Sequence, residues 1–112
     1  MKTFDFISDP GHAWLKVPVK LLIELGIDSD ITCFSYYRDG FAYLEEDCDA
    51  STFFRAMDKA NRPWKIRERN ARERRSKVRG YLCYTPAIAK NLSVLNAAEK
   101  IGVIQFVHVG GK

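Results

Sequence analysis

Apolar and polar residues alternate in two stretches near the N-terminus, TFDFI at residues 3–7 and HAWLKV at residues 12–17. This period of two predicts β-strands, because successive side chains of a strand point to opposite faces of a sheet. SDPG at residues 8–11 has turn composition, since proline presets one backbone angle and glycine frees the next residue. We therefore expect two strands with a turn between them.

Apolar residues at intervals of three or four predict three helices further along the chain. The first begins at Pro18, the second has Asp49 as its N-cap, and the third begins at Thr85 and Pro86. Their core candidates are Leu21, Leu22, Leu25, Phe53, Met57, Ala60, Ile88, Leu92, Leu95 and Ile101. The helices are expected to end at Gly26, Asn61 and Gly102, and VIQFVHV at residues 103–109 is expected to form a last buried strand.

A β-hairpin is the clearest local prediction. Asp39-Gly40 is a strong two-residue turn signal, and it lies between aromatic, alternating flanks in ITCFSYYRDGFAYLEE at residues 31–46. If these two residues form the turn, Tyr36 faces Tyr43 across the two strands.

Residues 62–80, RPWKIRERNARERRSKVRG, fit two shapes. A helix would have an apolar stripe too thin to bury, with arginines repelling each other on neighbouring turns. Alternation in WKIR at 64–67 and in KVRGYLCY at 77–84 favours two strands, joined by an exposed arginine-rich connection over 69–76. In this interpretation one face of the second strand carries Val78, Leu82 and Tyr84. Trp64 and Ile66 would anchor the resulting hairpin to the core.

These elements together predict a single α+β domain over residues 1–112, with about three helices against an antiparallel or mixed sheet. The composition, 46% hydrophobic and 29% charged, is that of a globular protein.

The chain has no apolar run of roughly 18 residues and no signal-peptide pattern at its N-terminus. Its three cysteines, Cys33, Cys48 and Cys83, lack metal-ligand spacing, so we expect reduced, buried thiols in a cytosolic protein.

The net charge of +4 comes from residues 62–80 alone. This segment holds nine lysines and arginines against two glutamates, whereas the remaining residues hold nine against twelve acids. Guanidinium groups pair bidentately with phosphate, and aromatic rings such as Trp64 and Tyr81 stack on bases. We therefore expect an arginine-rich hairpin that binds nucleic acid or a nucleoprotein complex. The predicted interface residues are Trp64, Lys65, Arg67, Arg69, Arg72, Arg74, Arg75, Lys77 and Arg79. The alternatives are that the same arginines bind an acidic protein surface, or that they form a solvated face.

No other motif gives positive support for catalysis. The acidic run EEDCDA at residues 45–50 lacks the glycine-containing loop of a calcium site, and carboxylates before a helix are favoured by its dipole alone. The run offers instead a docking partner for the arginine segment. His12 and His108 belong to no nucleophile or zinc motif, and VGGK at residues 109–112 precedes no helix. We predict no enzymatic activity, no metal and no cofactor.

Three strings, DPGHAWLKVP at 9–18, YLEEDCDAS at 43–51 and KVRGY at 77–81, resemble a small, uncharacterised family of bacteriophage, prophage and plasmid proteins. The resemblance covers roughly residues 4–84 and leaves residues 85–112 outside. It assigns no catalytic residue. It implies a mobile-element accessory protein in a bacterial cytoplasm, where such proteins often bind host machinery, including defence complexes such as CRISPR effectors. An inhibitor of host defence, anti-CRISPR-like, is therefore the alternative function.

Overall fold

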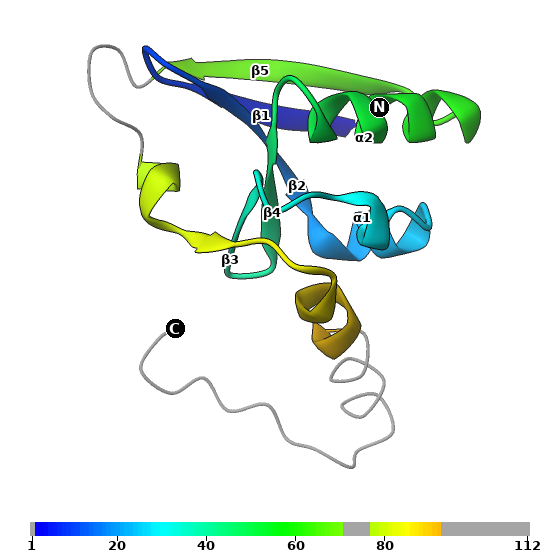
Figure 1. The fold of residues 1–112 in the computed structure, drawn as a ribbon. Coiled ribbons are helices and arrows are strands. Elements are labelled where there is room, and N and C mark those ends of the chain that lie inside the picture. The colour runs from blue at the N-terminus through cyan, green and yellow to red at the C-terminus, as the bar shows by residue number, and fades with distance from the viewer. Residues whose placement is uncertain (1, 71–76, 93–112) are drawn as a thin grey trace.

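The protein has an α+β fold built on a six-stranded mixed sheet, which confirms the predicted class (Figure 1). The computed structural model describes residues 2–70 and 77–92. In chain order the elements are β1 (Lys2–Ser8), β2 (Ala13–Pro18), α1 (Val19–Glu24), the 3₁₀ helix η1 (Asp28–Asp30), β3 (Tyr36–Arg38), β4 (Phe41–Glu45), α2 (Asp49–Lys59), β5 (Trp64–Asn70), the 3₁₀ helix η2 (Lys77–Gly80) and β6 (Leu82–Cys83), followed by helical residues 86–92. The predicted Leu95, Ile101, Gly102 and strand 103–109 lie outside the described residues.

The strand order is β5-β1-β2-β4-β3-β6, and β5 is parallel to β1 while the other neighbours are antiparallel. The hairpin at Asp39-Gly40 is confirmed, with Tyr36 opposite Tyr43 as predicted. Both turn residues have positive φ, 50° and 88°, as a tight hairpin turn of this type requires. The helix ends are also as expected, since Gly26 and Asn61 adopt left-handed conformations just after α1 and α2.

One face of the sheet packs against α1, α2 and residues 86–92 and holds the main core (Figure 1). The buried residues of this core include Phe4, Leu15, Val17, Leu21, Leu22, Ala42, Leu44, Phe53, Met57, Tyr84 and Ala89. Leu22, Phe53 and Met57 are almost fully buried, and Leu92 packs against the same cluster. These four predicted core residues therefore share one core, whereas Ala60, which was predicted with them, is exposed.

The opposite face carries a second, smaller cluster in which Trp14, Tyr43 and Val78 are buried. Trp14 follows Ala13 and precedes Leu15 on β2, so its side chain points away from the main core. Val78 lies on η2, which therefore covers this part of the face. Toward β1 and β5, the same face of the sheet carries the charged side chains of these two strands.

The prediction that residues 62–84 form an arginine-rich hairpin is wrong. Strands β5 and β6 lie at opposite edges of the sheet, and residues 77–80 form η2 instead of a strand. Val78, Leu82 and Tyr84 share no face: Val78 is buried beside Trp14, Leu82 is 66% exposed, and Tyr84 is buried in the main core. Alternation specifies which side chains point the same way, but it does not specify the partner strand, and β5 pairs with the N-terminal strand. Most of the predicted connection, residues 71–76, lies outside the described residues.

Asp49 was expected to cap α2, and this prediction is also wrong. Asp49 is the first residue of the helix and is fully buried. Its Oδ2 accepts hydrogen bonds from the backbone N–H of Thr32 at 3.0 Å, from Thr32 Oγ1 at 2.8 Å and from Ser35 Oγ at 2.5 Å. Ser35 Oγ in turn accepts from the N–H of Glu45 at 2.9 Å. The carboxylate thus ties the start of α2 to the loop before β3, because burial is favourable only with such partners.

The three cysteines are exposed, which corrects the expectation that they are buried. Cys33 lies in the loop before β3, Cys48 immediately precedes α2, and Cys83 is on the edge strand β6. Neither apolar cluster includes any of the three cysteines.

Tyr43 and Tyr84 are expected to ionise late in an alkaline titration. Burial raises the pKa of each phenol from 10.0 to about 12, helped at Tyr43 by the nearby Tyr81 and at Tyr84 by the carboxylates of Asp28 and Asp49. Between these values the unfolded chain has released the protons that the folded chain retains. The contribution of these two phenols to the free energy of unfolding is therefore fully present below pH 10 and is lost as the pH rises toward 12.

Ultraviolet absorbance of tyrosinate measures this directly, since the chain has five tyrosines. The phenols of Tyr43 and Tyr84 should ionise toward pH 12 while circular dichroism still shows the folded state. Tyr43→Phe should remove one of the late titrations. Ionisation of Tyr43 and Tyr84 near pH 10 in the folded protein would contradict the burial of these two side chains.

Candidate nucleic-acid interface

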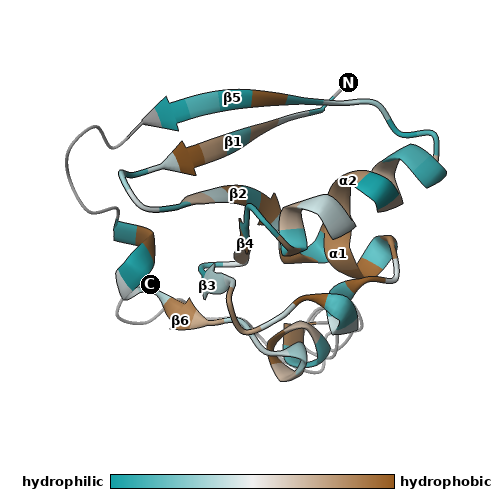
Figure 2. Cartoon of the chain, turned by 45° about the horizontal axis from the view of Figure 1, so that its top comes forward, coloured by the Kyte–Doolittle hydropathy of each residue, from teal (hydrophilic) through white to brown (hydrophobic). Residues whose placement is uncertain are grey.

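The strand β5 presents three cations on the face of the sheet opposite to the helices. Cross-strand partners in a parallel pair point the same way, and the register pairs Lys65 with Thr3, Arg67 with Asp5, and Arg69 with Ile7. Lys65, Arg67 and Arg69 are all exposed. Figure 2 shows β5 as a mostly hydrophilic strand at the edge of the sheet.

Asp5 anchors the two arginines without burying them. Its Oδ1 accepts from Arg67 Nε at 2.9 Å and lies 2.8 Å from Arg67 Nη2, while Arg69 Nε is 3.7 Å away. The Arg67 and Arg69 side chains remain 59% and 56% exposed. One carboxylate is shared by two guanidinium groups, so positive charge is left over for a partner.

Lys16 extends this surface onto β2. It is the cross-strand partner of Asp5, and its Nζ lies 4.4 Å from the centre of the Phe41 ring. Lys16, Asp5, Arg67 and Phe41 line one depression of about 210 Å³. We call Lys16, Lys65, Arg67 and Arg69 the basic face.

Trp64 lies on the other side of β5, toward α2. Its ring stacks on Phe54 with centroids 4.1 Å apart, and its Nε1 donates to Asp58 Oδ1 at 2.8 Å. Trp64 therefore anchors the edge strand to the helix, as expected, but it is turned away from the basic face. Ile66 is 40% exposed and contributes less to this anchoring than the alternation predicted.

Arg79 is held in a separate place by a buried carboxylate. Its Nε and Nη2 donate to Asp9 Oδ2 and Oδ1 at 2.7 and 2.9 Å, and the Asp9 side chain is only 1% exposed. Asp9 Oδ1 also accepts from the backbone N–H groups of Gly11 and His12. A Cβ atom at residue 11 would lie 2.9 Å from Arg79 Nη2, so glycine permits this close approach. The hydrogen bonds to Asp9 raise the pKa of the guanidinium above its usual value.

The remaining predicted interface residues are distributed differently. Lys77 is exposed on η2, and Arg72, Arg74 and Arg75 lie outside the described residues. The expected docking of the acidic run 45–50 on the arginines is not seen in the described segments, where ion pairs lead from Arg62, Arg67, Arg69 and Arg79 to Glu24, Asp5 and Asp9. Within residues 2–70 and 77–92, no group of three or more potential metal ligands is assembled.

The three sequence strings that suggested a family meet in space, which sequence reasoning missed. Asp9 from the first string binds Arg79 from the third, and Trp14 lies 5.5 Å from that guanidinium. Tyr43, from the second string, packs against Tyr81, with ring centroids 4.9 Å apart. The Asp9–Arg79 pair spans 70 positions, and no local period signals such a contact.

Comparison of the chain with protein-family models, curated proteins and solved structures found no match. Its function is therefore inferred from the residues themselves. Among the described residues, the helices are all too short or too polar to cross a bilayer.

Proposed function

We propose that the protein is a non-enzymatic accessory protein of a mobile genetic element that binds nucleic acid, or a nucleoprotein complex, through its basic face. The observation that carries this proposal is the alignment of Lys65, Arg67 and Arg69 on one side of an exposed edge strand. The mobile-element context comes only from the resemblance of the three sequence strings.

The spacing of these cations suits a chain of phosphates. Alternate residues of a strand repeat about every 6.6 Å, so the three side chains of β5 extend over roughly 13 Å. Lys16 adds a fourth cation beside this row, across the sheet from Asp5. A linear array of this kind can neutralise several successive phosphates without reading their bases. We therefore expect affinity for nucleic acid with little dependence on sequence.

A second candidate function is inhibition of a host defence protein. In this function the same arginines would bind an acidic surface of the host protein. The observation that favours it is the Arg67–Asp5 pair, in which two nitrogens of one guanidinium converge on a carboxylate oxygen. A partner's aspartate or glutamate can be bound in the same way.

A pull-down from bacterial lysate with and without nuclease separates the two functions. If nucleic acid is the ligand, nuclease treatment should release whatever the tagged protein captures. A host protein that stays bound after nuclease, and is lost when Lys65, Arg67 and Arg69 are neutralised, would favour the second function. If the captured material changes neither after nuclease treatment nor when these three cations are neutralised, both proposed uses of the basic face would be refuted.

A further inference from the structure

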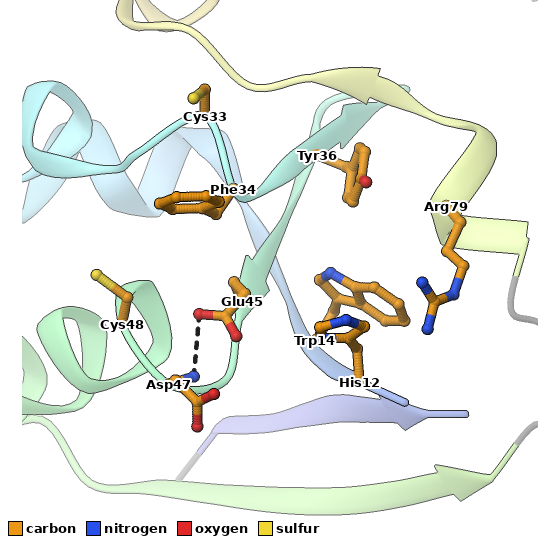
Figure 3. Close-up of a pocket in the computed structure, with 9 residues that line it drawn as sticks. All are labelled: His12, Trp14, Cys33, Phe34, Tyr36, Glu45, Asp47, Cys48 and Arg79. Atoms are coloured by element: carbon orange, nitrogen blue, oxygen red, sulfur yellow. Dashed lines mark hydrogen bonds between the residues drawn. The ribbon is translucent and has the colours of Figure 1, made fainter. Parts of the chain in front are cut away.

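A pocket of about 490 Å³ opens beside η2, on the part of the sheet away from β5 (Figure 3). Its aromatic walls are formed by Trp14 and His12 from the start of β2 and by Phe34 and Tyr36 at the start of β3. Glu45 and Asp47, from the end of β4 and the loop after it, supply carboxylates.

The aromatic rings that line the pocket are inclined to one another. Trp14 and Tyr36 meet edge to face with centroids 6.2 Å apart, and His12 lies 5.9 Å from Trp14. Trp14 is almost fully buried, whereas Phe34 is 68% exposed. The open ring of Phe34 is therefore the aromatic surface that a ligand can cover most completely.

The rim of the pocket carries negative charge from Glu45 and Asp47. The backbone N–H of Asp47 donates to Glu45 Oε1 at 3.1 Å, which fixes the Glu45 carboxylate at the rim beside Asp47 (Figure 3). Arg79 lines the opposite wall, but its guanidinium is paired with Asp9. The charge of Asp49 raises the pKa of the Cys48 thiol on the same rim, with smaller contributions from burial and from Glu45. A cation is favoured here, and a phosphate is not.

We propose that this pocket binds an arginine side chain of a partner protein. A guanidinium can stack on Phe34 or Tyr36 while its N–H groups donate to Glu45 and Asp47. The same combination already exists inside the protein, where Arg79 is bound by a carboxylate and lies 5.5 Å from the Trp14 ring. The pocket differs from that internal site in being open to solvent.

This inference is independent of the basic face and has the opposite sign of charge. It gives the molecule two surfaces, one for a polyanion at β5 and one for a basic protein beside η2. Proteins that package or process nucleic acid are rich in arginine, so a nucleoprotein complex presents ligands for both.

Titration with N-acetyl-arginine amide, followed by NMR of isotope-labelled protein, tests the pocket directly. We expect saturable shifts at the Trp14 indole and the Phe34 ring, with a Kd on the order of 1 mM, as is typical for one small cationic side chain. The citrulline analogue, which has nearly the same shape without the charge, should leave these signals unchanged.

Two variants complete the test. The double variant Glu45→Gln, Asp47→Asn keeps the shape of the rim and should weaken binding by at least roughly tenfold, because both charged acceptors are lost. Phe34→Ala removes the exposed ring and should weaken binding without unfolding the protein, as preserved dispersion of the NMR spectrum will verify. Equal shifts with citrulline, or undiminished binding by the double variant, would overturn the proposal. Neutralising Lys65, Arg67 and Arg69 should leave this titration unaffected, so failure of one surface does not imply failure of the other.

Discussion

Replacing Lys65, Arg67 and Arg69 together by glutamine is expected to weaken the binding of a plain single-stranded oligonucleotide by roughly 100-fold at about 50 mM salt. Each cation that meets a phosphate releases about 0.7 of a counterion from a single strand, and this gain is largest at low salt. The three side chains are exposed, and the ion pairs of Arg67 and Arg69 with Asp5 are at the surface. Thermal unfolding should therefore change little, because exposed ion pairs contribute little to stability. Fluorescence anisotropy measures the affinity.

A matched control removes the same charge from the other side of the molecule. Lys20, Arg55 and Lys59 are exposed on α1 and α2, and glutamine suits a helix as well as lysine or arginine does. This triple variant should bind the oligonucleotide within a few-fold of the wild type, because its cations lie on the helices rather than in the basic face. Equal losses in the two variants would show that only net charge matters, and would refute a localised interface.

Phe53→Ala is expected to lower the free energy of unfolding by about 3–5 kcal/mol. Phe53 is fully buried on α2 and meets Phe4 of β1 edge to face, with ring centroids 5.1 Å apart. Truncation leaves a cavity between the helix and the sheet, which the packed surroundings cannot fill. Denaturant unfolding followed by circular dichroism gives the measurement.

Phe34→Ala is the control with the same chemical change at an exposed site. Because 68% of Phe34 is exposed, its truncation should alter stability by no more than about 0.5 kcal/mol. A loss below about 1 kcal/mol for Phe53→Ala would mean that α2 does not close the main core in solution.

Local signals explain which parts of the fold were predictable. Asp39-Gly40 encodes its own turn, and the register of β3 and β4 follows from it without reference to the rest of the chain. The spacing of Phe53 and Met57 similarly specifies the buried side of α2. In each case the physical cause lies within a few residues of its effect.

The errors arose where the partner is distant in sequence. Alternation placed Lys65 and Arg67 correctly on one face, but the pairing of β5 with β1 depends on packing across the whole sheet. Asp49 looks like a helix cap locally, yet its hydrogen bonds go to Thr32 and Ser35, which the chain brings close only after folding. The predicted site is likewise divided, because Arg79 is bound to Asp9 while the arginines of β5 remain exposed.

The salt dependence of oligonucleotide binding by the wild-type protein tests the central claim most directly. With about four phosphates neutralised by the four cations of the basic face, a plot of log K against log salt should have a slope near −3 to −4, depending on the type of strand. Neutralising Lys65, Arg67 and Arg69 should flatten the slope by about two units, because three phosphate contacts are removed. No measurable binding at the lowest salt, or a wild-type slope that the variant reproduces, would contradict nucleic-acid binding by the basic face.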